Sequence, residues 1–352
     1  MSDPFENADR AGGRGQRASI GLCTAVIVVT ALYFSGTVFA PLAFALLIIA
    51  IIWPVQKRLQ MRLPKLVALA ASMLLTVVIL AAFVSLIAWG FGRVGRYIVA
   101  DAARFQLLYG QMAEWLEGHS IAVAGLWAEH FNVGWLVRLF QQATIRLNSM
   151  LSFSLVMLIY VMLGLLEVDD AASKLRAAGA GEFGRVLLAG GVETAAKLRR
   201  YMVVRTLMSV MTGLLVWGFA ILVGLPLAAE WGVIAFALNY VPFIGPFVAT
   251  VFPTLFAIAQ FESWQMAVLV FACLNLIQFL VGSYLEPRIA GTALSISPFL
   301  VLFAVFFWTF VWGIAGAFIG VPIVIAALTL CEQHPASRWF ADLLGGPGGK
   351  AA

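Results

Sequence analysis

The residues of this chain that are best suited to bind a polar ligand lie in one octapeptide. It is placed in the middle of a stretch of 31 residues without a charged side chain, between Glu230 and Glu262. It reads Asn239-Tyr240-Val241-Pro242-Phe243-Ile244-Gly245-Pro246. Each proline removes a backbone donor and clashes with the turn before it, and glycine adds backbone freedom, so the pattern predicts a broken helix. The freed carbonyls and the Asn239 amide could coordinate an ion or a polar molecule, although the amide could equally cap a half-helix.

A second interrupted segment lies nearer the C-terminus. It reads Trp312-Gly313-Ile314-Ala315-Gly316-Ala317-Phe318-Ile319-Gly320-Val321-Pro322. Gly313 and Pro322 predict a kink or a break. Gly316 and Gly320 form a G-x-x-x-G pair, which is typical of close packing between helices.

The two breaks occupy corresponding places in the C-terminal half. The charge-free run 206–229 precedes the interrupted run 231–261, and the run 263–285 precedes the interrupted run 289–331. Paired broken helices of this kind indicate a binding site at the interface of two repeats. An internal duplication is therefore a hypothesis, since the residues of the two halves are only weakly similar.

Four further polar residues could take part. Asn275 and Gln278 lie one turn apart and either line the same cavity or form a hydrogen bond between helices. Glu286 and Arg288 flank Pro287 at a predicted membrane boundary. They could be interfacial anchors or form a gate, and Glu286 could also carry a proton. Ionisable residues are missing from the interior of every charge-free run, so a buried proton relay is not expected. The predicted pathway residues are Asn239, Pro242, Gly245, Pro246, Asn275, Gln278, Gly313, Gly316, Gly320 and Pro322, with Glu286 and Arg288 as gate or coupling residues.

Enzymatic chemistry finds no support in the sequence. The chain has no G-x-x-x-x-G-K-[ST], no H-E-x-x-H and no G-x-S-x-G. Its three cysteines are far apart, with no C-x-x-C. Its basic residues form no stripe with interleaved aromatics. We therefore expect no catalytic residue, no cofactor, no metal site and no nucleic-acid partner.

The composition indicates what kind of secondary structure carries these residues. Hydrophobic residues make up 62% of the 352 and charged residues 11%, whereas soluble proteins have roughly 25% charged residues. Charge-free runs of 20 residues or more can cross a membrane. They are 18–56, 66–92, 147–166, 206–229, 231–261, 263–285 and 289–331. The first is long enough for a hairpin of two short helices around Ser35 and Gly36. We predict an all-α polytopic membrane protein of about eight spans, or seven, with broken or re-entrant helices in the C-terminal half.

The remaining segments are assigned by charge and periodicity. Two are predicted to be amphipathic helical segments outside the spans, and both tails to be disordered. Of the 22 Lys and Arg residues, 16 fall on the side of the N-terminus in the eight-span arrangement, which places both termini in the cytoplasm. The predicted organisation is a tail at 1–17, N-terminal spans at 18–92, an amphipathic segment at 93–146, a fourth span at 147–166, an amphipathic segment at 167–205, a transport core at 206–330 and a tail at 331–352.

Several motifs together resemble the autoinducer-2 exporter family of bacterial membrane proteins. In the C-terminal half they are the two interrupted segments, Leu285-Glu286-Pro287-Arg288-Ile289 followed by Gly291, and Ser297-Pro298. Upstream of these, the segment 201–226 contributes Arg205, Gly213 and Gly224-Leu225-Pro226, together with the preceding Arg200. The opening hairpin contributes Pro54 and the loop 57–65. The resemblance covers nearly all of 18–330. It implies an inner-membrane permease, in a family with members linked to export of the furanone autoinducer-2 and others linked to sodium/proton exchange.

The sequence therefore predicts a permease that exports a small polar molecule, with the break at 239–246 facing the break at 313–322. The alternatives are a sodium or other cation/proton antiporter that uses Glu286, and a non-transporting oligomeric scaffold. Separate surroundings for Asn239, Asn275 and Gln278 would favour the scaffold. The expected partners are the lipid bilayer, a small-molecule substrate, a coupling proton or sodium ion, and further copies of the chain.

Overall fold

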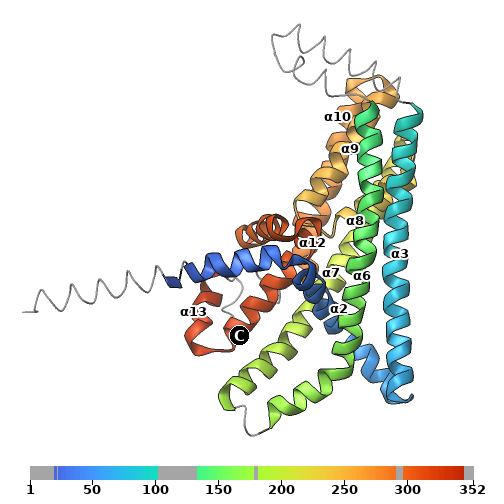
Figure 1. Ribbon diagram of the computed structural model, residues 1–352. Coiled ribbons are helices and arrows are strands. Elements are labelled where there is room, and N and C mark those ends of the chain that lie inside the picture. Colours follow the sequence, from blue (N-terminus) through green and yellow to red (C-terminus); the bar gives the residue numbers. More distant parts are fainter. Residues whose placement is uncertain (1–19, 22, 102–132, 178–180, 291–295, 345–352) are drawn as a thin grey trace, which may run out of the picture.

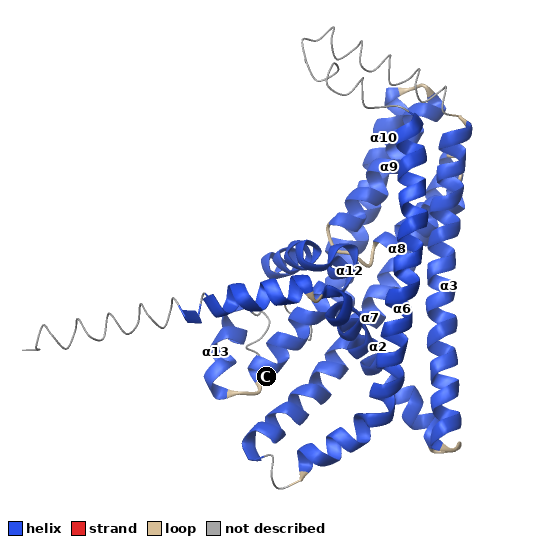
Figure 2. Ribbon diagram, viewed as in Figure 1, coloured by secondary structure: helices blue, strands red, loops and turns tan. Residues whose placement is uncertain are grey.

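The computed structural model describes residues 20–21, 23–101, 133–177, 181–290 and 296–344, and every regular element in these ranges is a helix (Figures 1 and 2). An unlabelled helix, Cys23–Phe34, precedes the labelled ones. These are α2 (Gly36–Gln60), α3 (Lys65–Ala100), α6 (Val133–Arg176), α7 (Gly181–Val223), α8 (Ala228–Leu238), α9 (Ile244–Phe261), α10 (Trp264–Phe279), the π-helix η2 (Leu280–Leu285), α11 (Glu286–Ala290), α12 (Pro298–Glu332) and α13 (Pro335–Leu344).

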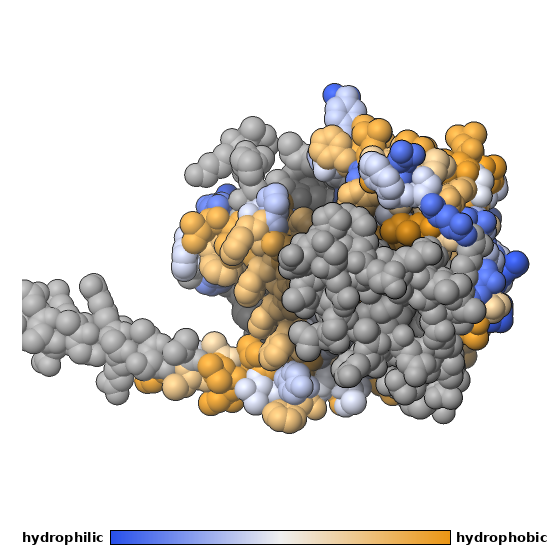
Figure 3. All heavy atoms as spheres, turned by 90° about the horizontal axis from the view of Figure 1, so that it is seen from above, coloured by the Kyte–Doolittle hydropathy of each residue, from blue (hydrophilic) through white to orange (hydrophobic). Residues whose placement is uncertain are grey.

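Seven stretches of helix in the described residues are long and apolar enough to cross a membrane. They are α2, α3, α9 and α12 in full, Ser152–Arg176 in α6, Gly184–Val223 in α7, and Trp264–Ile289 through α10, η2 and α11. Large apolar side chains are exposed along these helices, and Figure 3 shows apolar residues at the described surface. Such a surface is stable in lipid but not in water. The prediction of an all-α polytopic protein is confirmed, and the count of seven rests on length and composition alone.

The long helices α2, α3, α6 and α7 form a bundle with two distinct ends (Figure 1). At one end, here called the basic end, the turn between α2 and α3 lies beside the C-terminal part of α6. Lys57 bridges Asp169 at 3.4 Å, and Lys65 donates to the Leu166 carbonyl at 3.3 Å. At the other end, here called the far end, Arg93 of α3 bridges the buried Glu230 of α8 at 2.9 Å.

The chain reverses direction between α7 and α8 at the far end. Gly224 and Leu227 both have positive φ angles, of 74° and 61°, which turn the chain back along α7. The two helices then approach through a pair of glycines. A Cβ on Gly213 would lie 2.9 Å from the Gly232 carbonyl oxygen, and a Cβ on Gly232 would lie 2.8 Å from that of Gly213. Glycine is required here because the two backbones are in direct contact.

Several predicted boundaries differ from the structure. The amphipathic segment 167–205 does not form separate surface helices, because α6 continues to Arg176 and α7 already begins at Gly181. Both helices simply extend beyond the apolar core, where charged side chains are tolerated. At the Ser35 turn, Figure 1 shows Cys23–Phe34 leaving the bundle at a steep angle to α2 instead of folding back along it as a hairpin.

The C-terminal tail is helical in part, contrary to the predicted disorder of 331–352. The helix α13 is amphipathic and buries Ala341 in a cluster with Leu300 and Leu328 of α12. This burial explains why the segment is ordered. Residues 1–17, most of the predicted segment 93–146, and residues 345–352 lie outside the described ranges.

Candidate functional site

The first predicted break is present and spans 239–243, between the end of α8 at Leu238 and the start of α9 at Ile244. Phe243 has a φ of 62°, a conformation that is strained for any residue other than glycine. Pro246 lies in the first turn of α9. Backbone N–H groups there have no acceptor within the helix, so the N–H that proline lacks is not missed. A Cβ on Gly245 would lie 1.9 Å from the Leu238 carbonyl oxygen, so α9 packs directly on the end of α8.

The second break lies at Trp312 and Gly313, where φ is −128° and 63°. It divides α12 into two arms, 298–311 and 314–332. Their contacts are antiparallel, because a Cβ on Gly316 would lie 1.7 Å from the Trp308 carbonyl oxygen and one on Gly320 would lie 2.8 Å from that of Ala304. The G-x-x-x-G pair thus packs the two arms of one hairpin. The predicted break at Pro322 is wrong, since the second arm continues through it.

The two hairpins are too short to cross a membrane on both arms. At 1.5 Å per residue, α8 is about 16 Å long and the first arm of α12 about 21 Å, against a hydrocarbon core of about 30 Å. Both are therefore re-entrant elements. In lipid, such backbone is stable only where protein or a water-lined cavity surrounds it.

The hairpins enter the bundle from opposite ends. Trp231 at the start of α8 packs against Phe256 near the end of α9, at 5.4 Å between ring centroids, so this hairpin opens toward the far end. Lys197 of α7 bonds Glu332 at the end of α12 at 2.6 Å, so the α12 hairpin opens toward the basic end. The helices that precede the two hairpins, α7 and α10, also run in opposite directions. This arrangement is that of an inverted-topology repeat, which agrees with the duplication hypothesis.

The tips of the hairpins meet inside the bundle. The ring of Tyr240 in the first tip stacks on Phe318 in the second arm of α12, with centroids 5.6 Å apart. Val241 and Ile244 join Trp312 and Phe318 in one apolar cluster. The structure therefore brings together the two breaks that the sequence predicted to face each other.

The polar groups of the first tip are bound to α7. The Asn239 amide donates to the Ser209 hydroxyl at 3.2 Å, and the Tyr240 hydroxyl donates to Thr206 at 3.0 Å. Asn239 is buried, and its side chain caps no helix end. Sequence reasoning missed this face of α7. The signal that could have found it is the recurrence of Tyr201, Arg205, Ser209 and Thr212 every three or four residues.

Glu286 and Arg288 have different surroundings. The Nη1 group of Arg205 donates to both carboxylate oxygens of Glu286, at 3.0 and 2.9 Å. The guanidinium of Arg288 instead lies over the ring of Tyr284, 4.2 Å from its centroid. The helix also continues through Pro287, because the preceding π-turn shifts the hydrogen bonding so that the Glu286 amide bonds Val281, five residues back.

Comparison of the sequence with known proteins places the chain in a family. The sequence model described as AI-2E family transporter matches residues 22–336, which is nearly the whole chain and includes both hairpins. The chain belongs to the AI-2E transporter family. The AI-2 transport protein TqsA of Escherichia coli K12 is 28% identical over 344 residues, covering 94% of this chain and 96% of TqsA.

Shorter matches to other members agree with this assignment. The putative transport protein YhhT of Escherichia coli K12 is 29% identical over 56% of each chain. A putative transport protein of Borreliella burgdorferi is 33% identical over 43% of this chain and 42% of its own. This AI-2E protein is thus a multi-span membrane transporter, as the resemblance in the sequence implied.

Two predicted pathway residues of this AI-2E protein are not placed with the tips. Asn275 is exposed on α10, and its amide donates to the Phe271 carbonyl of its own helix at 2.8 Å. Gln278 is half-buried, and its Nε2 atom has no partner among the described residues. Asn239 and Asn275 therefore have separate surroundings, the arrangement expected of a scaffold. Membership of the AI-2E family outweighs this observation, since the relatives are named as transport proteins.

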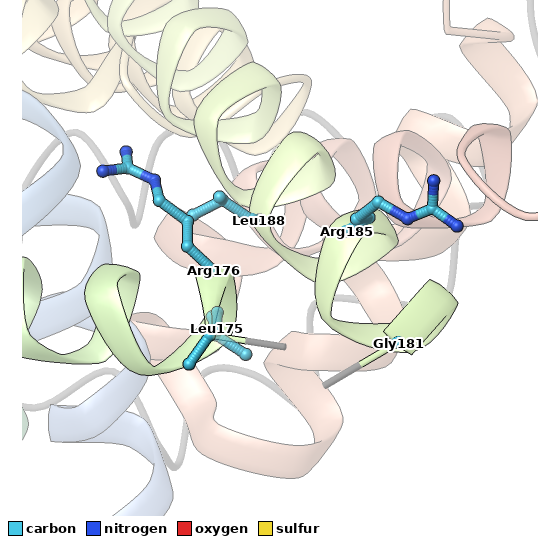
Figure 4. A pocket seen from close by; sticks show the side chains of 6 residues that line it. Leu175, Arg176, Gly181, Arg185 and Leu188 are labelled. Atoms are coloured by element: carbon cyan, nitrogen blue, oxygen red, sulfur yellow. The ribbon is translucent and has the colours of Figure 1, made fainter. Parts of the chain in front are cut away.

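Elsewhere in the AI-2E protein, one groove lies at the basic end, at the connection from α6 to α7. Its volume is about 390 Å³, and Arg176 and Arg185 point in different directions around it (Figure 4). It is remote from the hairpin tips along α7. Within the described ranges, no group of three or more His, Cys, Asp or Glu residues is positioned to hold a metal ion.

Proposed function

We propose that this AI-2E protein is a permease of the bacterial inner membrane that moves a small polar molecule outward past the two hairpin tips. The observation that carries the proposal is the meeting of two re-entrant hairpins from opposite ends, through Tyr240 and Phe318. Broken helices of this kind surround the substrate sites of transporters. The relative TqsA is named as an AI-2 transport protein, so autoinducer-2 is the first cargo to test.

Charge supports the orientation in this proposal. The turn at the basic end carries Lys57, Arg58, Arg62 and Lys65 and no acidic residue. Basic residues accumulate in short cytoplasmic loops, so this end would face the cytoplasm. The end of α12 is bonded to Lys197 near the basic end, which would put the C-terminus there too. Arg10, Arg14 and Arg17 favour the same side for the N-terminus.

The Asn239 amide provides the test. In a strain that lacks the endogenous exporter, we expect Asn239→Ala to lower autoinducer-2 efflux, because the first tip loses its bond to Ser209. Asn275→Ala is the matched control, since among the described residues that amide bonds its own helix. Membrane insertion of both variants is checked by fractionation. Unchanged efflux in Asn239→Ala, or an equal loss in Asn275→Ala, would contradict this placement of the pathway.

Two further expectations, a coupling ion and an oligomeric state, belong to the same proposal. We expect a coupling proton or sodium ion, which flux in proteoliposomes under imposed gradients would identify. We also expect a homo-oligomer, which the mass of the detergent-solubilised protein by light scattering would test. A monomeric mass would contradict the second expectation and leave the pathway unaffected.

A further inference from the structure

The buried face of α7 is polar where a membrane helix is usually apolar. Tyr201, Arg205, Ser209 and Thr212 recur at a spacing that places them on one face, and each is at most 8% exposed. A buried hydroxyl or charge is costly unless it is bonded. Ionisable residues inside membrane helices therefore tend to mark functional sites. Arg205 is the charged member of this set.

Arg205 lies between the two hairpins. One turn further along α7, Ser209 accepts the Asn239 amide of the first tip. One turn earlier, Tyr201 packs in a cluster with Ile319 of the second arm of α12. Arg205 is thus adjacent to elements of both repeats, at the junction that the proposed pathway crosses.

The ion pair with Glu286 leaves donors unused. A single nitrogen, Nη1, serves both carboxylate oxygens, and the buried Nε atom has no partner among the described residues. The guanidinium also lies 6.0 Å from the centroid of the Tyr201 ring. Arginine binds an oxyanion best through two parallel N–H bonds. The site therefore has capacity that Glu286 does not fill.

Of the two partners in the ion pair, Glu286 is better placed than Arg205 to move away from the other. Its side chain is 26% exposed against 8% for Arg205. It also follows the π-turn η2, and π-turns inside helices are frequent at functional sites. A carboxylate at this position is less enclosed by protein than the guanidinium and can move aside while the guanidinium stays buried.

We propose that Arg205 binds an anionic group of the cargo, a carboxylate or a phosphate, and that Glu286 occupies that place when no cargo is bound. The cargo part rests on the proposed transport function and narrows it to a small anion. Exchange of one oxyanion for another keeps the buried guanidinium neutralised throughout, which avoids the cost of an unpaired buried charge. The Glu286 carboxylate itself marks the volume that the cargo group would fill.

Binding of radiolabelled inorganic phosphate tests the site directly. The protein is purified in detergent or in phosphatidylcholine nanodiscs, and ionic strength is held constant with chloride. We expect Glu286→Gln to bind phosphate about tenfold tighter than the wild type, because the tethered carboxylate no longer competes. The double variant R205Q/E286Q should lose this binding, and as a neutral pair it leaves no unpaired buried charge. Glu193→Gln, which removes a carboxylate near Lys197 at the basic end, should bind as the wild type does.

Three results would overturn the proposal. The first is a folded Glu286→Gln variant, monodisperse by gel filtration, with no gain in phosphate affinity. The second is equal affinity in the double variant. The third is loss of phosphate binding when phosphatidylglycerol is added to the nanodiscs, which would assign the site to a lipid headgroup instead of a cargo. Absence of wild-type efflux contradicts the transport function alone, and it leaves the phosphate result unchanged.

Discussion

Tyr240 and Phe318 stack at 5.6 Å between ring centroids, although 78 residues separate them and their hairpins enter from opposite ends. Phe83 and Phe236 pack edge-on against the same tyrosine, at 5.5 and 5.7 Å. The ring thus makes the central contact between the hairpins, whereas its hydroxyl bonds Thr206 of α7.

We therefore expect Tyr240→Ala to lower the free energy of unfolding by about 3 kcal/mol, as for other buried aromatic truncations, and to reduce efflux. Tyr240→Phe keeps the ring and should cost about 0.6 kcal/mol, the typical value of a hydrogen bond between membrane helices. Thermal unfolding in detergent and efflux in cells measure both effects. Equal losses in the two variants would show that the hydroxyl, not the stack, joins the tips.

The tight turn of α12 gives a second prediction. Gly316→Ala would place a methyl group 1.7 Å from the Trp308 carbonyl oxygen, so the arms must separate. We expect this variant to aggregate or to unfold at a clearly lower temperature. Gly218→Ala on α7 is the control, because no atom of the described part of the chain lies within 4 Å of its Cβ position. Fluorescence-detected gel filtration compares them, and two similar monodisperse profiles would contradict the hairpin.

Pro54, which lies inside α2, gives a third prediction. Proline cannot bond the carbonyl four residues back, and Arg199 of α7 instead donates to that carbonyl of Ala50 at 2.9 Å. We expect Arg199→Met to cost about 2 kcal/mol in the natural background, as for a hydrogen bond from a charged group. In the Pro54→Ala background, the backbone N–H of residue 54 can bond the Ala50 carbonyl. Arg199→Met should then lower the free energy of unfolding by less.

Chemical or thermal unfolding of the four proteins in this cycle measures the coupling, which we expect to be about 1 kcal/mol. Arg200→Met, at the exposed neighbouring position, is the control. Strictly additive losses would mean that Arg199 does not replace the missing helical bond.

The antiporter alternative is open to a direct test at Glu286. Its carboxylate is paired with Arg205, and in the proposed exchange it acts as a counter-ion of the guanidinium. In liposomes with an imposed pH gradient, we expect Glu286→Gln and the wild type to show the same response to sodium. Arg288→Gln serves as a control for charge removal nearby. Loss of sodium-dependent proton movement in Glu286→Gln alone would establish the antiporter.

The sequence predicted the positions of both breaks because proline and glycine act locally on the backbone. It left open whether each break forms a broken helix or a re-entrant one, since the pairing of the α12 arms depends on contacts such as Gly320 with Ala304. The partner of Glu286 was also missed. Arg205 lies 81 residues away, at the edge of an apolar run, where a basic residue is usually an interfacial anchor. Asn275 was expected to line the cavity or to bond another helix, but it is exposed on α10 and bonds its own helix. Its one-turn spacing from Gln278 puts both amides on one face of α10, but it does not indicate whether that face is turned toward the breaks.

The opposite directions of the two hairpins imply a separate barrier for each side of the membrane. A movement of the α8–α9 tip would admit solvent only from the far end, and a movement of the α12 tip only from the basic end. Each hairpin also has its own contact with α7, through Asn239 and Ser209 for the first and through Ile319 and Tyr201 for the second. Two independent closures would let the protein exchange its contents with each compartment in turn without ever becoming an open channel.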